Sequence, residues 1–168
     1  MFDRFVSRLR AFLGESLANS LRRRLRAAAP SPISELREGL HCRIAGTVRV
    51  HDHTTLTAPL SGRACVAYLL EVIETLGGAS GDHLLIYDKQ SVPFVLSDGG
   101  HNAVVDPTHS QILLALTEQV TVRSEFLDDP RQRAVLERYR PGGASYMNTR
   151  RMRYREWVVE PGARVTLA

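Results

Sequence analysis

Hydrophobic residues recur at spacings of three and four over residues 2–27, which is the periodicity of one face of an α-helix. Gly14 interrupts this pattern and costs about 1 kcal/mol relative to alanine. A run of alanines and the segment Pro30–Pro32 then end the helix. We predict an amphipathic helix within residues 1–29 and a linker at 30–35. The apolar face consists of Phe2, Phe5, Val6, Leu9, Phe12, Leu13, Leu17, Leu21 and Leu25, with Arg4, Arg8, Arg22 and Arg26 opposite.

From residue 36 onward the pattern changes to short apolar or alternating runs separated by turn residues, which favours β-strands. Two helical pieces interrupt them: a single turn capped by Ser34, and a helix that begins around Asp128–Pro130 and ends near Tyr139. We predict a mainly β fold, a small partly open OB-like β-barrel at 36–168 with the N-terminal helix and one or two short inserted helices. The predicted strands are 40–50, 56–60, 64–76, 83–89, 92–96, 103–105, 119–126, 146–159 and 164–167.

The last two predicted strands flank Pro161 and Gly162, a pair that suits a type II turn because glycine can adopt the required positive φ. The first of these strands contains the single tryptophan of the chain, Trp157. We therefore expect a closing β-hairpin rather than a catalytic loop.

The net charge of +4 is unevenly distributed. Residues 1–29 contain seven arginines against Asp3 and Glu15, a net of +5, so the remaining residues sum to about −1. A domain that binds nucleic acid through a uniformly basic surface would not distribute its charge in this way. No apolar run approaches the roughly 20 residues of a transmembrane helix, and the start lacks the apolar core of a secretory signal. We expect a cytoplasmic protein, or one held peripherally on the cytoplasmic face of a membrane.

Candidate catalytic or metal-binding residues are few. The segment His51–His53, with His41 or His101, has ligand-type side chains, but a polar turn collects the same residues and spacing assigns no third ligand. Cys65 paired with a histidine would be a nucleophile, but its apolar strand favours an inert core thiol. We expect no enzymatic activity, no metal and no cofactor.

Two further segments allow a binding interpretation. The segment Ser97–Gly100 can cradle an anion with its backbone amides, although a hairpin turn explains it equally. The strand before Pro161 concentrates arginines near aromatic rings, as in barrels that bind single-stranded nucleic acid, although acidic neighbours would pair such arginines on a solvated strand. This candidate partner surface consists of Arg150, Arg151, Arg153, Arg155 and Trp157, with Tyr146 and Tyr154 nearby.

Four segments, in order, resemble the GIDE domain, also called BAM (beside-a-membrane), known from a mitochondrial membrane ubiquitin ligase and its prokaryotic relatives. They are Leu56–Tyr68, Pro93–Gly99, Ala103–Pro107 and Tyr154–Val165. With the start at Leu36, Gly39 and Gly46, the resemblance spans about residues 33–168. It implies a non-enzymatic β-domain close to a membrane. The zinc-binding RING of the animal ligase is absent from the sequence, so ubiquitin transfer is not implied, and an amphipathic helix stands where the family usually has transmembrane helices.

The expected function is therefore binding: an adaptor that acts close to a membrane or within a larger assembly. We expect a protein partner, with an anionic membrane surface or a second copy of the chain as candidates for the helix. The alternative is an OB-like module that binds single-stranded nucleic acid, which the charge distribution disfavours. The residues assigned to the membrane or partner contact are Phe2, Phe5, Arg8, Leu9, Phe12, Leu13, Arg22, Arg23 and Arg26.

Overall fold

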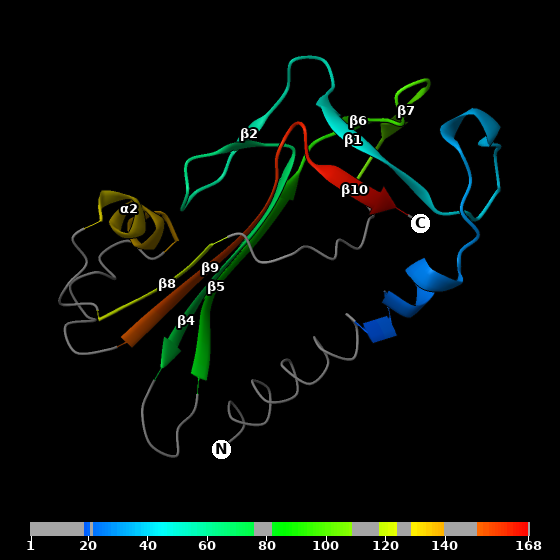
Figure 1. Ribbon diagram of the computed structural model, residues 1–168. Coiled ribbons are helices and arrows are strands. Elements are labelled where there is room, and N and C mark those ends of the chain that lie inside the picture. Colours follow the sequence, from blue (N-terminus) through cyan, green and yellow to red (C-terminus); the bar gives the residue numbers. More distant parts are fainter. Residues whose placement is uncertain are drawn as a thin grey trace.

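The computed structural model describes residues 19–20, 22–75, 82–108, 118–123, 129–139 and 151–167. Strands dominate these residues and are arranged in open sheets rather than in a closed barrel, so the predicted mainly β, partly open fold is confirmed. Figure 1 shows two four-stranded sheets side by side, a long one at the lower left and a shorter one at the upper right.

The shorter sheet has the strand order β10-β1-β6-β7, with all neighbours antiparallel. Gly46 allows its two central strands to approach, because a Cβ there would lie 2.6 Å from the Ser97 carbonyl oxygen. The inner face packs Val48 against Phe94 and Val159. The strands are β1 (Ile44–Val50), β6 (Phe94–Ser97), β7 (Asn102–Val105) and β10 (Arg164–Leu167).

The longer sheet has the order β5-β4-β9-β8, again antiparallel throughout. Its strands are β4 (Ala67–Thr75), β5 (Asp82–Ser91), β8 (Glu118–Arg123) and β9 (Arg151–Val159). The predicted strand 64–76 is divided at Val66, whose amide donates to the Val159 carbonyl at 2.9 Å. The short strands β2 (Leu56–Thr57) and β3 (Ala64–Cys65) pair with each other.

The predicted closing hairpin is wrong, although its turn is correct. Gly162 has a φ of 89°, and the Ala163 amide donates to the Glu160 carbonyl at 3.1 Å. The two strands that flank the turn nevertheless belong to different sheets, because β9 pairs with β4 and β8, whereas β10 pairs with β1. Val48 of β1 holds the turn from the side: its carbonyl accepts from Gly162 and its amide donates to the Ala163 carbonyl. The Pro161–Gly162 turn thus joins the two sheets.

Two other local predictions need correction. The predicted strand 56–60 ends at Thr57, because residues 58–62 turn back on themselves through a Gly62 amide to Ala58 carbonyl bond. The early helical turn is η1 (Ile33–Glu35), and it has no capping bond from Ser34. The Ile33 amide donates to Asp98 instead, at 3.2 Å.

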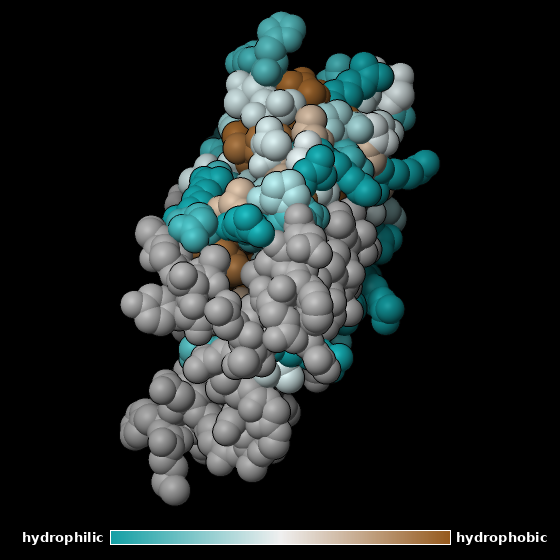
Figure 2. Space-filling view, turned by 90° about the vertical axis from the view of Figure 1, so that its left-hand side faces the viewer, coloured by the Kyte–Doolittle hydropathy of each residue, from teal (hydrophilic) through white to brown (hydrophobic). Residues whose placement is uncertain are grey.

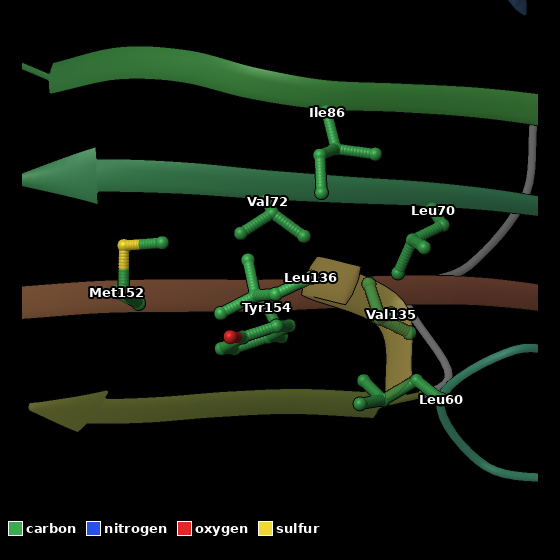
Figure 3. Packing of buried hydrophobic residues seen from close by; sticks show 8 residues of the cluster. All are labelled: Leu60, Leu70, Val72, Ile86, Val135, Leu136, Met152 and Tyr154. Atoms are coloured by element: carbon green, nitrogen blue, oxygen red, sulfur yellow. The ribbon is translucent and has the colours of Figure 1, made fainter. Parts of the chain in front are cut away.

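The main hydrophobic core lies between the long sheet and α2 (Pro130–Tyr139). Figure 3 shows Val135 and Leu136 of α2 facing Tyr154 of β9 and Val72 of β4. The helix begins as predicted, since the Asp129 carboxylate accepts from the Arg131 amide at 2.8 Å. Tyr68 and Tyr139 both donate to Asp88 Oδ2, the former at 2.7 Å, and burial and Asp88 raise the pKa of both phenols. These bonds fix the C-terminal end of α2 on the sheet.

Candidate binding surfaces

The described part of the basic helix, residues 19–20 and 22–27, is tied to the body of the protein through its C-terminal end. Arg43, just before β1, donates from Nη1 to the Leu25 carbonyl at 3.3 Å and from its amide to the Ala29 carbonyl at 2.8 Å. The Arg43 carbonyl accepts from the Ser31 amide at 2.9 Å. These bonds hold the end of the helix next to the start of β1 in the shorter sheet.

This anchored segment presents positive charge to solvent. The predicted contact residues Arg22, Arg23 and Arg26 are exposed, as is Arg24, whereas Leu25 is half-buried. The other predicted contact residues of the helix, Phe2, Phe5, Arg8, Leu9, Phe12 and Leu13, lie outside the described residues. The surface that can be built on the structure is therefore the arginine row at 22–26, which we call the basic row.

A loop next to the basic row exposes two leucines that sequence reasoning did not single out. Residues 31–42 form a loop whose two ends lie side by side, because the flanking residues Pro30 and Arg43 form a parallel bridge. Leu36 is 37% exposed and Leu40 49% exposed, and they are two of the four large hydrophobic residues exposed among the described residues. In the sequence both leucines stand among charged and polar residues, and this was the signal that could have singled them out.

The arginines predicted on the last long strand share one face of the long sheet. Arg151, Arg153, Arg155 and Trp157 alternate along β9 and so point to the same side. Arg150 lies outside the described residues. Glu71 of β4 lies opposite Arg155 on one side and opposite Tyr87 of β5 on the other, so all three side chains share this face. Tyr87 is 60% exposed.

Two features weaken this face as a nucleic-acid surface. The proposed stacking residue Tyr154 points to the opposite side and is fully buried in the core, where burial raises the pKa of its phenol. Arg153 forms an ion pair with Asp82 at 2.5 Å. Glu71 is half-buried and lies opposite Arg155 on the neighbouring strand. Burial raises the pKa of Glu71 by more than the nearby Arg155 and Arg153 lower it. Acidic groups therefore already occupy part of this face.

Figure 2 views the protein from the left of Figure 1 and shows mostly hydrophilic colour over the described residues. Hydrophobic colour is limited to small separate patches on this face. Large contiguous apolar patches are what usually mark stable protein interfaces on a surface. The face in this view therefore offers no such patch over the described residues. The stronger candidates for a contact are the basic row and the loop of residues 31–42 with Leu36 and Leu40, which we call the leucine loop.

Glu156 is a buried carboxylate of β9 that holds the turn at residues 58–62. Its side chain is fully buried, and it accepts hydrogen bonds from the amides of Leu60 at 2.7 Å and Ser61 at 2.9 Å. In the same turn, the Ser61 carbonyl accepts a hydrogen bond from the Arg131 guanidinium of α2 at 2.6 Å. Glu156 thus has a structural role in holding residues 58–62 and α2 together.

Cys65 is placed for packing rather than for nucleophilic attack. It is fully buried, and its thiol lies 3.7 Å from the Leu56 carbonyl oxygen. Burial, followed by the charges of Glu156 and Glu160, raises the pKa of the thiol from 9.0 to about 11. A thiol that stays protonated at neutral pH is a poor nucleophile.

The two cysteines should therefore differ sharply in labelling. At pH 8, iodoacetamide should modify the half-buried Cys42 in the folded protein and leave Cys65 unmodified until urea unfolds the chain. Peptide mass mapping checks this, with a Cys42→Ala variant as the control for single-site labelling. Because the unfolded thiol ionises near pH 9 and the folded thiol near 11, the stability that Cys65 contributes should be lost as pH rises through that interval. Equal labelling of both thiols in the folded state would contradict this placement.

The histidine segment forms the polar turn that the sequence favours over a metal site. Asp52 and His53 have φ values of 48° and 57°, and the Thr54 amide donates to the His51 carbonyl at 3.0 Å. Residues 52 and 53 are therefore not part of an extended strand. Among the described residues, no group of three or more histidine, cysteine or acidic side chains could hold a metal ion.

The side chain of Asp98 satisfies two amides at the Ser97–Gly100 turn. Asp98 Oδ1 accepts from the amides of Gly100 at 3.1 Å and His101 at 2.8 Å. These bonds and the one from Ile33 lower the pKa of Asp98, so its carboxylate stays ionised. The predicted hairpin turn is confirmed, and Asp98 already accepts from two of the amides that an external anion would need.

Comparison with models of protein families, with curated proteins and with solved structures gives no match for this chain. Within the described residues, no helix combines the length and apolar character needed to cross a membrane. The resemblance to the GIDE family consequently stays a prediction that rests on the four sequence segments.

Proposed function

We propose that this protein is a non-enzymatic binding module that docks on an anionic membrane surface through its basic row and leucine loop, and there positions a protein partner. The observation that carries the proposal is the anchoring of the basic row by Arg43, since it holds four exposed arginines at a defined place on a β-fold. A charged segment with a fixed orientation presents its arginines together to a flat anionic surface.

Electrostatics and apolar contact act together in this proposal. Each arginine near an anionic bilayer contributes about 1 kcal/mol, and the attraction falls off within a Debye length. Leu36 and Leu40 add apolar surface that can enter the interface between headgroups and acyl chains. The amphipathic pattern of residues 2–25 in the sequence supplies further apolar residues of the same kind.

The double variant R23Q/R24Q should bind vesicles of phosphatidylcholine and phosphatidylserine about 30-fold more weakly than the unmodified chain, because two contributions of about 1 kcal/mol are lost. Cosedimentation at low salt measures the apparent affinity. The matched control is R133Q/R138Q on α2, which removes the same charge from two exposed arginines. Equal losses in the two variants, or binding that does not change between 50 and 500 mM salt, would refute docking through the basic row.

The second candidate function is binding of single-stranded nucleic acid on the arginine face of β9. The observation that favours it is the row of Arg151, Arg153, Arg155 and Trp157 beside the exposed Tyr87. Salt-sensitive binding of an oligonucleotide that is lost in Trp157→Ala and kept in R23Q/R24Q would support it over the membrane proposal.

A further inference from the structure

The outer face of the shorter sheet contains a hollow of about 250 Å³ that the proposed function does not use. Its polar lining comes from three adjacent strands and the turn after β6. The side chains with hydrogen-bonding or charged groups are Thr47, Arg49, Ser97, Asp98 and Arg164.

Strand register brings these side chains to one side of the sheet. Thr47 of β1 lies opposite both Arg164 of β10 and Ser97 of β6. Residues directly opposite each other in antiparallel strands point to the same face. Arg49 is two residues from Thr47 and therefore shares that face. Two guanidinium groups and two hydroxyls thus converge across three strands.

Ser97 and Thr47 add hydroxyl groups to the lining of the hollow. Ser97 is only 6% exposed, and it lies opposite Thr47 on the neighbouring strand. A hydroxyl group can donate a hydrogen bond to an oxyanion bound in the hollow.

The charges of the hollow select an anion. Arg49 and Arg164 are exposed and form no ion pair within the described part of the chain. Asp98 is the only acidic residue of the lining, and its two carboxylate oxygens already accept from the amides of Ile33, Gly100 and His101. Two unpaired arginines against one occupied carboxylate leave a net positive site with free donors.

We propose that this hollow binds a phosphate group. Guanidinium groups bind tetrahedral oxyanions through short charge-assisted hydrogen bonds, and hydroxyl donors complete the coordination of the remaining oxygens. The phosphate belongs either to a lipid headgroup or to a soluble phosphate monoester, since both present the same terminal oxygens. The inference does not depend on membrane docking by the basic row, which lies on a different segment.

The test is an NMR titration of the full chain with inorganic phosphate at constant ionic strength, with chloride as the matched salt. Saturable shifts confined to residues 45–49, 97–99 and 164 are expected. Ser97→Ala and the double variant R49Q/R164Q should each weaken the affinity about tenfold or more, because each removes donors to a charged group. The control Arg37→Gln changes an exposed arginine outside the hollow and should have no effect.

Two further arms distinguish the sources of phosphate. If the source is lipid, vesicles with phosphatidate should bind more tightly than vesicles with equal charge as phosphatidylserine, and R49Q/R164Q should remove that difference. If the source is soluble, glycerol phosphate should bind, and vesicle binding should be the same in R49Q/R164Q and the unmodified chain. Unsaturable shifts spread over the surface, or equal weakening by Arg37→Gln in a folded protein, would overturn the site. A loss of vesicle binding in R23Q/R24Q alone concerns only the basic row.

Discussion

Replacing Glu156 by alanine should destabilise the protein by about 2–4 kcal/mol, because one buried amide and one partly buried amide lose their acceptor, and an unsatisfied buried amide costs about 1–3 kcal/mol. The amides are those of Leu60 and Ser61, and the side chain that satisfies them is fully buried. The space left by the side chain adds a cavity contribution of the same sign. Urea denaturation followed by circular dichroism gives the free energy of unfolding.

Glu160 is the matched control for this change, since it lies four residues further along. Its carboxylate is about half exposed and forms an ion pair with Arg63 at 3.6 Å. Such surface pairs contribute about 0–1 kcal/mol, so Glu160→Ala should change the stability little. If Glu156→Ala does not fold, Glu156→Gln provides the measurement, because it keeps the volume and one carbonyl acceptor and should cost less. Similar effects of the alanine variants at 156 and 160 would contradict the structural role of Glu156.

Replacing Gly46 by alanine should destabilise the protein by about 2 kcal/mol, because overpacking of a well-packed site costs about 1–3 kcal/mol. An added Cβ would lie 2.6 Å from the Ser97 carbonyl oxygen and 2.9 Å from Leu96 Cγ. The nearer atom is backbone, so relief requires β1 and β6 to separate. The change also reduces the freedom of the unfolded chain, which favours folding by about 0.4–1 kcal/mol and does not offset the clash.

Gly100→Ala is the control for the effect on the unfolded chain. Its added Cβ would meet only Asp98 Oδ1, at 3.9 Å, which is an ordinary contact. This variant should be neutral or slightly stabilising by the same unfolded-state argument. A Gly46→Ala protein as stable as Gly100→Ala would show that β1 and β6 do not approach as closely as the structure has them.

Local patterns predicted the elements whose formation depends on neighbouring residues. The helix Pro130–Tyr139 was predictable because Asp129 can cap it and proline suits its first turn. The turn at Pro161–Gly162 was predictable because glycine permits its positive φ. Alternation along β9 likewise placed Arg151, Arg153 and Arg155 on one face.

Pairing between distant strands was not predictable from the same patterns. A turn of two residues usually joins paired strands, and the sequence contains no signal that Val48 would hold this turn and send β9 and β10 into different sheets. The strand predicted over residues 56–60 was too long for a similar reason, since β2 ends at Thr57. Its amide bonds to Glu156, which lies 96 residues away in the chain.

The amino-acid sequence alone determined that this protein is mainly β, that its net positive charge lies in the first 29 residues, and that arginines alternate along one late strand, because periodicity and charge are properties of neighbouring residues. Only the tertiary structure decided that Glu156 is a buried acceptor, that Tyr154 belongs to the core, and that Arg49, Ser97 and Arg164 line one hollow. The reason is physical: burial and convergence arise from contacts between segments far apart in the chain, and these are set by which strands pair.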